Sequence, residues 1–380
     1  MYKIKFFVTP VYPYGHDHYY HEIIALSEGL IELGHDVSCN VNYWFQPEYN
    51  SYLLKENSKD DYEIAIYDFR YTRSFEHLLF RKGYPNFKKN ALKILVDRND
   101  WISPIWKDNR QYQIFDLILA GHLLKNISYP ANVRPWSIGL TNRITHSIDK
   151  YFNKNEKSEN IIGHNFRVAH NMREYVLKGI ENNLKKYRLH SCFTNPENFK
   201  DLTDAYYWKS STGRHDPDYF KLLNSKLMFA SFGGYYEYKP IAYTPYTLTD
   251  KIRRKPYFWY SKVLFKKNKS IAPAVFVFQY DNFRFWEVLY SRACPVNLNF
   301  ESWDFLMPVN PVEGKHYVGI NKFDFYEFAD RIEKMPLERI QEIGLKGRQW
   351  VNQNYSPVAQ AKRLLEYIVC LFVFLELYIF

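Results

Sequence analysis

Short apolar runs alternate with amphipathic or polar stretches along almost the whole chain. We expect strands at residues 4–8, 37–41, 63–69, 92–97, 116–121, 134–139, 160–165, 188–193, 226–233 and 294–299. Between the first two runs, apolar residues spaced three and four apart (Ile23, Leu26, Leu30 and Leu33) place one apolar stripe on a helix. This alternation is typical of parallel sheets covered by helices, and it predicts an α/β fold with about six β/α repeats before residue 145.

The length of the chain and one polar segment predict two domains. At 380 residues the chain exceeds one ordinary domain. Residues 149–160 (DKYFNKNEKSEN) are nearly free of aliphatic side chains, which is typical of a linker. We therefore expect two α/β domains, residues 1–148 and 161–364, with a cleft between them. Ligands of such sheets bind outside the carboxyl ends of the strands, so the loops that follow the strands are where binding residues should lie.

The composition excludes several classes of protein. Hydrophobic residues make up 46% of the chain and aromatic residues 19%, which rules out a disordered or low-complexity protein. The four cysteines lie far apart, so neither a disulfide scaffold nor a structural zinc site is expected, and a reducing, cytoplasmic location fits. No run reaches the roughly 18 apolar residues that span a bilayer. The net charge of +10 favours anionic partners, but it leaves nucleic acid, phosphorylated metabolites and membrane surfaces open.

Several segments, taken in order, resemble the GT-B glycosyltransferases. Residues 33–37 (LGHDV) resemble the end of the opening unit of that class, and residues 134–140 (RPWSIGL) resemble its turn before the second domain. Residues 219–234 (YFKLLNSKLMFASFGG), 284–289 (RFWEVL) and 293–296 (ACPV) resemble the donor-binding half of exostosin-like and spore-coat CgeB-like transferases. The resemblance implies two Rossmann-like domains that face each other across a cleft, and transfer of a sugar from a nucleotide diphosphate without a metal ion.

The resemblance also assigns donor-binding roles to particular residues. In these families the glutamate that matches Glu287 binds the ribose, and a carboxylate can accept two strong hydroxyl hydrogen bonds. Arg284, one turn earlier, is expected either to pair with the pyrophosphate or to hold Glu287, and the plain alternative is a surface salt bridge. Many retaining members carry a second glutamate, separated from the first by seven residues. That position is Gln279 here, which can still bind a sugar hydroxyl but leaves the stereochemistry open.

Further donor-site candidates follow the first strands of the second domain. Gly233 and Gly234 come after a strand, where glycine permits close approach of the backbone to a ligand, and we extend this reasoning to Lys226. Arg167 and Arg173 stand where GT-B enzymes often place a cation on the diphosphate. The plain alternatives are a tight turn for the glycines and a solvated helix face for Arg173.

The densest ionisable cluster is residues 14–22 (YGHDHYYHE), in a first-domain loop that faces the acceptor in GT-B enzymes. Inverting members often use a His, Asp or Glu there to deprotonate the attacking hydroxyl. Asp17 and His18, together with His16, are therefore the candidate bases. Two alternatives stay open: a metal site that also uses His21, although no HExxH motif is present, or a helix start that these side chains cap and line.

Four aspartates are weaker candidates for the site. Asp97 and Asp100 follow another first-domain strand, where an aspartate is more often a helix cap than a cleft residue. Asp216 and Asp218 match the DxD element with which the other main transferase fold holds a divalent ion. A turn and helix N-cap explain that pair without a metal, and we expect no metal site in the protein.

Two further segments bear on partners. Residues 240–272 look like an insertion, and residues 251–269 within it carry eight Lys or Arg, no acid and five aromatic residues. They fit stacking on sugars with cations on phosphate, contact with an anionic membrane, or a solvated loop. Residues 365–380 are apolar, with one charge in the last 13 positions. We expect a helix that packs back on the first domain, with membrane contact as the alternative.

Together these features predict a glycosyltransferase that moves a sugar from a nucleotide-diphosphate donor to a hydroxyl of a glycan or glycolipid, in polysaccharide biosynthesis. The expected partners are the nucleotide sugar and the acceptor, without a cofactor and without nucleic acid. The expected location is cytoplasmic, including a peripheral position at the inner membrane face. The alternatives are a non-catalytic carbohydrate- or nucleic-acid-binding protein and a sugar-nucleotide epimerase on the same fold.

Overall fold

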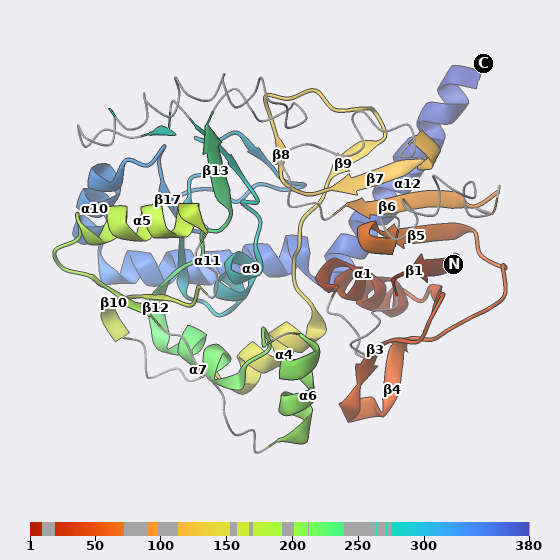
Figure 1. The fold of residues 1–380 in the computed structure, drawn as a ribbon, viewed down its shortest axis with the longest axis horizontal. Coiled ribbons are helices and arrows are strands. Elements are labelled where there is room, and N and C mark those ends of the chain that lie inside the picture. Colours follow the sequence, from red (N-terminus) through yellow and green to blue (C-terminus); the bar gives the residue numbers. More distant parts are fainter. Residues whose placement is uncertain are drawn as a thin grey trace.

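The computed structural model describes residues 1–9, 20–71, 88, 90–97, 113–152, 158–166, 170–191, 201–211, 213–238, 263, 271–272 and 275–379. Within them the chain forms two α/β units side by side, each built on a parallel sheet (Figure 1). The predicted α/β class is confirmed, because neighbouring strands in both main sheets are parallel.

The first domain contains a six-stranded sheet in the order β2-β1-β5-β6-β7-β9. Its elements are β1 (Lys3–Phe7), α1 (His21–Glu32), β2 (Asp36–Cys39), β3 (Tyr43–Gln46), the short 3-10 helix η1 (Pro47–Tyr49), β4 (Ser51–Leu54), β5 (Ile64–Asp68), β6 (Leu92–Asp97), β7 (Leu117–Ala120), β8 (Leu123–Leu124) and β9 (Val133–Pro135). β5 and β7 are buried throughout, because apolar side chains pack on both faces of this sheet.

Helix α1 ends where Gly34 allows the chain to turn. Gly34 has φ +81°, its amide donates to the carbonyl of Ile31, and the amide of His35 donates to the carbonyl of Leu30. These two bonds form a Schellman motif. The motif favours glycine because the residue at the position of Gly34 has a left-handed backbone conformation. The motif directs the chain into β2, which pairs with β1.

The expectation of about six β/α repeats is wrong at two described connections. Between β2 and β5 the chain forms an antiparallel hairpin, β3–β4. Between β7 and β9 it forms β8, which pairs with a strand of the second domain. Short apolar runs do not reveal whether a connection is a helix or a hairpin. The aromatic segment at Trp44 therefore did not predict the hairpin that it forms.

The second domain contains a five-stranded sheet in the order β11-β10-β12-β15-β17. Its elements are α4 (Asn142–Lys150), β10 (Ser158–His164), α5 (Asn171–Glu181), β11 (Arg188–Ser191), α6 (Leu202–Ser210), α7 (Pro217–Ser225), β12 (Lys226–Ala230), β13 (Tyr235–Tyr238), β14 (Val275–Phe278), α9 (Phe283–Tyr290), β15 (Cys294–Leu298), β16 (Phe305–Leu306), β17 (Val318–Ile320), α10 (Phe325–Lys334), α11 (Leu337–Tyr355) and α12 (Pro357–Ile379). β13 and β14 form an antiparallel pair outside the main sheet.

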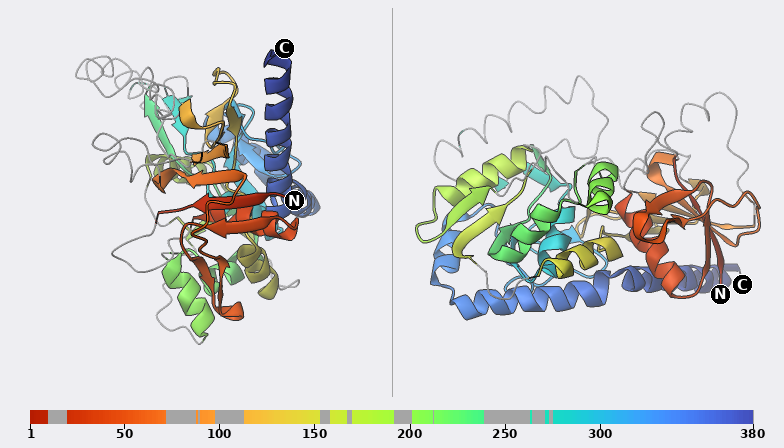
Figure 2. Two further views of the ribbon diagram at one scale, coloured as in Figure 1. Left: turned by 90° about the vertical axis from the view of Figure 1, so that its right-hand side faces the viewer. Right: turned by 90° about the horizontal axis from the view of Figure 1, so that it is seen from below.

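Two described segments, one before α4 and one after α11, connect the domains. Ile138 and Ile144 already belong to the core of the second domain, so the core changes before the polar segment at 149–160. After α11 the chain returns, and Leu364 on α12 joins the core of the first domain, where α12 packs along α1. Figure 2 shows α11 and α12 in succession along one side of both domains. In the part of the chain that is described, no helix is long and apolar enough to cross a bilayer.

Helix α6 connects the domains at a second place. The Tyr207 hydroxyl donates to Glu48 of the first domain at 2.5 Å, and its ring lies 5.7 Å from that of Trp44. Arg143 on α4 stacks over the same tyrosine ring and pairs with Asp204 of α6. These contacts hold the β3–β4 hairpin against the second domain (Figure 1).

Candidate active site

The order of the second sheet indicates where a ligand should bind. From β10 the chain moves outward to β11 and then crosses to β12 on the other side of β10, so the order reverses between β10 and β12. In open parallel sheets, ligands bind at the carboxyl ends of the strands at such a point. The segments that leave this point are Asn165–Phe166 after β10 and residues 231–234 after β12.

Helix α9 begins beside the same point. Its N-cap is Asn282, whose side-chain oxygen accepts a hydrogen bond from the amide of Arg284 at 3.1 Å. The amide nitrogen of the Asn282 side chain donates to the carbonyl of Ser231 at 2.8 Å, which ties the helix start to the segment after β12. An asparagine cap and this cross-link fix the position of the first turn of α9, and with it the position of Arg284.

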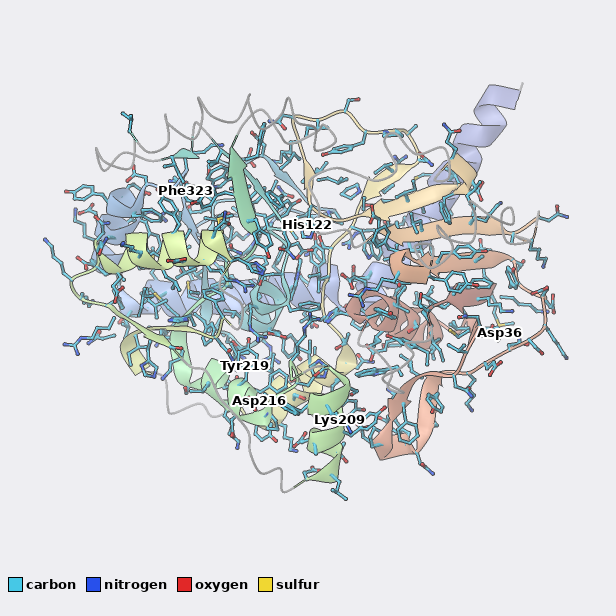
Figure 3. The ribbon with its side chains drawn as sticks, viewed as in Figure 1. Asp36, His122, Lys209, Asp216, Tyr219 and Phe323 are labelled. Atoms are coloured by element: carbon cyan, nitrogen blue, oxygen red, sulfur yellow. The ribbon has the colours of Figure 1, made fainter. Side chains whose placement is uncertain are left out.

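Arg284, Glu287 and Tyr219 form a buried group at the start of α9. The Glu287 Oε2 atom accepts hydrogen bonds from Arg284 Nη1 at 2.8 Å and from the Tyr219 hydroxyl at 2.7 Å. The Arg284 guanidinium also lies 4.1 Å from the centre of the Tyr219 ring. Glu287 is only 1% exposed, so the alternative of a surface salt bridge is wrong: the pair is i,i+3, but it lies inside the protein. Figure 3 labels Tyr219, which lies on α7.

The arrangement keeps Arg284 charged and points it at the strand ends. Burial acts to lower the pKa of Arg284, but the oxygens of Tyr219 and Glu287 outweigh burial, and the pKa lies above its usual value. Arg284 Nε donates to the carbonyl of Asn165, directly after β10, at 3.3 Å. Burial raises the pKa of Tyr219 well above its ordinary value, so its hydroxyl remains a donor. Both hydrogen bonds end on Oε2 of Glu287, which leaves Oε1 able to accept from a ligand.

Arg173 supplies a second cation near Arg284. It lies in the first turn of α5, and its guanidinium is 4.9 Å from the centre of the Phe166 ring, on the segment after β10. Burial and the nearby charge of Arg284 lower the pKa of Arg173 to about 10, so it is still protonated at neutral pH. Two like charges at one switch point repel each other, and an anion between them would relieve that repulsion.

The two glycines serve the packing of the protein itself. A Cβ atom on Gly233 would lie 2.8 Å from the side-chain nitrogen of Asn282, and one on Gly234 would lie 2.1 Å from the carbonyl of Phe278. Gly234 also has φ +91°, a conformation that L side chains rarely adopt. Close approach therefore does occur at this turn, as we expected, but in this structure the approaching group is the connection between β14 and α9.

Gln279 follows β14 directly and has an unusual conformation. Its φ is +54°, and its side-chain oxygen is buried without a hydrogen-bond donor among the described residues. A non-glycine residue in the left-handed region carries strain, which is often found at ligand sites. The side-chain oxygen of Gln279 can therefore still accept a hydrogen bond from a ligand.

The first-domain candidates His16, Asp17 and His18 lie outside the described residues, as do Arg167, Asp100 and most of the insertion 240–272. The described end of their loop is informative. His21, at the start of α1, donates from Nε2 to the carbonyl of Gly139 at 2.9 Å, and its ring lies 5.1 Å from that of Phe283 on α9. The loop that contains the candidate bases therefore joins α1 where α1 meets the helix that carries Arg284.

Lys226 and Asp216 lie at the ends of secondary-structure elements, and their positions decide their roles. Lys226 is the first residue of β12, at the amino end of the strand, whereas ligands bind beyond the carboxyl end, so its assignment to the donor site is wrong. Asp216 caps α7 by accepting from the amide of Asp218 at 3.0 Å, which confirms the N-cap interpretation of the DxD match (Figure 3). Asp97 ends β6 and is buried. Among the described residues, no three His, Cys, Asp or Glu side chains gather as metal ligands would.

Sequence reasoning missed Tyr219 and Asp281. Tyr219 is 68 positions before its partner Glu287, and Asp281 reaches a residue 143 positions away. Tyr219 begins the segment 219–234 that resembles the transferases, but nothing in that segment indicates a bond to Glu287, and Asp281 lies in no motif. A local signal was Asn282, a typical N-cap residue directly before the segment with Arg284 and Glu287, which indicated that the residues next to it would be held in place.

Neither protein-family models nor curated proteins gave a match to this chain. Solved structures gave matches. An alpha-glucosyltransferase in complex with UDP and a 13-mer DNA containing a central A:G mismatch superposes with a TM-score of 0.52 at 9% sequence identity, over 97% of this chain and 100% of that one. An alpha-glucosyltransferase in complex with UDP-glucose and DNA containing an abasic site gives a TM-score of 0.52 at 10% identity, over 97% and 99%.

These superpositions span nearly the whole of both chains, and at this level of identity they define the fold. The chain has the glycosyltransferase fold called GT-B, with two Rossmann-like domains. The fold class predicted from the sequence is confirmed.

Proposed function

We propose that this protein is a glycosyltransferase that transfers a sugar from a nucleotide-diphosphate donor to a hydroxyl group of a glycan or glycolipid. The observation that carries the proposal is the pair of arginines at the switch point of the second sheet. Arg284 is held there by buried partners and donates to the carbonyl of Asn165, and Arg173 lies over the ring of the next residue, Phe166. The oxygens of a diphosphate can accept charge-assisted hydrogen bonds from two guanidinium groups.

The nucleotide part of the donor would be held by Glu287. Its Oε1 atom is free to accept from a ribose hydroxyl while Oε2 remains bonded to Arg284 and Tyr219. This role rests on the resemblance of residues 284–296 to exostosin-like and spore-coat CgeB-like transferases. Gln279, with its buried side-chain oxygen, would bind a hydroxyl of the transferred sugar. UDP and UDP-glucose, which the superposed alpha-glucosyltransferase structures contain, are the first donors to test.

The first domain would supply the acceptor side. Asp17 or His18, with His16 beside them, would remove the proton of the attacking hydroxyl, since a carboxylate next to a histidine raises the basicity of the imidazole. The two arginines would stabilise the negative charge that develops on the leaving diphosphate, so the proposed chemistry needs no metal ion. Exclusion of water from the site would make hydrolysis of the donor slow relative to transfer to the acceptor.

The proposal extends to partners and location. The basic aromatic segment at 251–269 suits phosphate-bearing or membrane-associated acceptors, because its cations would attract anionic lipid and its aromatic residues suit an interface. We therefore propose a cytoplasmic enzyme with peripheral membrane contact and a carbohydrate acceptor. Nucleic acid is not part of the proposal, since this positive charge lies in one segment and no nucleic-acid-binding motif is present in the sequence.

Nucleotide binding tests the proposal directly. Calorimetric titration with UDP and UDP-glucose should give saturable binding that is unchanged by EDTA. Arg173→Ala should weaken the binding of UDP at least 10-fold, because a hydrogen bond to a charged group contributes about 1.5–3 kcal/mol. Arg188→Ala is the matched control, because this exposed arginine lies at the amino end of β11 in the same sheet. If neither UDP nor other nucleotide sugars bind, or if the two variants behave alike, the assignment of the arginine pair is wrong.

A further inference from the structure

The segment between β9 and α4 is held by groups from both domains. It takes the chain from the first domain into the second, and its peptide groups bond to side chains and carbonyls that lie far away in the sequence. The four bonds are Ile138 N to Asp281 Oδ2 (2.9 Å), Gln360 Nε2 to Ile138 O (3.1 Å), His21 Nε2 to Gly139 O (2.9 Å) and Leu140 N to Tyr355 O (3.0 Å). This passage is therefore a fixed connection in the present arrangement of the domains.

Asp281 connects this passage to helix α9. Its Oδ2 atom accepts from the amide of Ile138, and its Oδ1 atom accepts from the indole nitrogen of Trp286 at 2.6 Å. Trp286 is fully buried on α9 between Arg284 and Glu287. Asp281 is itself buried, and burial raises its pKa. Each oxygen of the carboxylate has a different N–H donor, one from the passage and one from the helix.

The main chain of Asp281 reaches the first domain as well. Its amide donates to Nδ1 of His122 at 3.4 Å, and the His122 ring stands edge-on to Tyr280 at 5.4 Å. His122 follows β7, at the carboxyl end of a first-domain strand, and has φ +58°. Figure 3 shows it near the middle of the molecule, between the two sheets. Asp281 is thus attached to the first domain by its backbone, and its side chain is attached to the passage that leaves that domain.

We propose that Asp281 is a positioning residue for the transfer reaction: it aligns helix α9, with Arg284 and Glu287, to the first domain. The inference rests on the proposed function, but it adds a separate claim. The arginine pair and Glu287 all lie in the second domain, so nucleotide binding does not require this alignment. Reaction does require it, since the groups proposed to activate the acceptor lie in the first domain and a small misplacement of reacting groups costs much of the rate.

Asp281→Asn separates these two effects. Asparagine has nearly the same shape, but an NH2 group replaces one of the two oxygens, so in the present geometry the N–H of either Ile138 or Trp286 would face a donor instead of its acceptor. Asp149→Asn is the matched control. Asp149 also accepts two hydrogen bonds, from Tyr290 of α9 and from Arg348, but these partners all lie within the second domain. Trp286→Phe removes the donor to Oδ1 while the bond to Ile138 remains. This variant replaces Asp281→Asn in the test if Asp281→Asn folds poorly.

The test combines UDP calorimetry, the rate of UDP-glucose hydrolysis per UDP-binding site and hydrogen–deuterium exchange. In Asp281→Asn we expect the UDP dissociation constant to stay within about 3-fold of wild type and the rate per site to fall at least 10-fold. We also expect faster exchange in residues 136–142, and neither the rate nor this exchange should change in Asp149→Asn. A normal rate in Asp281→Asn, or a loss of UDP affinity as large as the loss of rate, would overturn the positioning role alone. If the wild-type protein binds no nucleotide, the proposed function fails and this role fails with it.

Discussion

Replacement of Glu287 by alanine should lower the free energy of unfolding by about 3–5 kcal/mol, because it leaves the buried charge of Arg284 without its carboxylate partner. The Tyr219 hydroxyl would lose its acceptor at the same time. Tyr219 is fully buried, so water cannot replace its missing acceptor without opening the core. Chemical unfolding followed by tryptophan fluorescence measures the change directly.

Two further variants serve as controls for this measurement. Glu287→Gln retains an oxygen that can accept from Tyr219 or Arg284, so it should be destabilised less than the alanine variant. Glu342→Ala removes a carboxylate that also pairs with two cations, Arg339 and Lys346, but does so on the surface, and it should change stability little. If Glu287→Ala and Glu342→Ala unfold at the same denaturant concentration, Glu287 does not hold Arg284 in the way the structure indicates.

The second large effect concerns pH. Glu28 lies buried on α1, where one carboxyl oxygen accepts from the amide of Asn142 at the start of α4 at 2.8 Å. Burial raises the pKa of Glu28 to about 8 from an ordinary value of 4.5; the hydrogen bond from Asn142 opposes the shift and the charge of Glu32 adds to it. Between pH 4.5 and 8 the folded state therefore holds a proton that the unfolded state releases.

The sign of the effect follows from that proton. The stability contribution of Glu28 is fully present below about pH 4.5 and is lost as the pH rises toward 8, by on the order of 1.4 kcal/mol per pH unit. Glu28→Gln cannot ionise, so the variant should match wild type near pH 5 and exceed it by several kcal/mol near pH 8.5. Unfolding curves of both proteins across this range test the prediction. Equal slopes would contradict it, and Glu32→Gln should reduce the slope only slightly.

The regular parts of the fold were predictable from the sequence because burial on both faces of a parallel sheet imposes continuous apolar runs. The strand expected at residues 92–97 has those bounds in the structure. The expected strand at 226–233 ends at Ala230, since Gly233 and Gly234 turn away against Asn282 and Phe278. A glycine pair indicates a turn, but it does not give the residue at which the strand ends.

The candidate site was predictable only in part. Arg284 and Glu287 share a motif and a helix face, so sequence spacing identified them as a pair. Burial, and not spacing, decides what that pair does: with Glu287 almost inaccessible, its first role is to hold Arg284. Tyr219 is brought to α9 from 68 positions away, and Asp281, which lies next to α9, binds Ile138 from 143 positions away. No local pattern contains that information.

The structure of the protein crystallised with UDP-glucose tests the central claim most directly, namely that a donor diphosphate binds between Arg284 and Arg173 at the switch point of the second sheet. We expect the diphosphate oxygens within hydrogen-bonding distance of both guanidinium groups and a ribose hydroxyl at Oε1 of Glu287. A nucleotide bound to the first-domain sheet, or one whose diphosphate touches neither arginine, would contradict the claim.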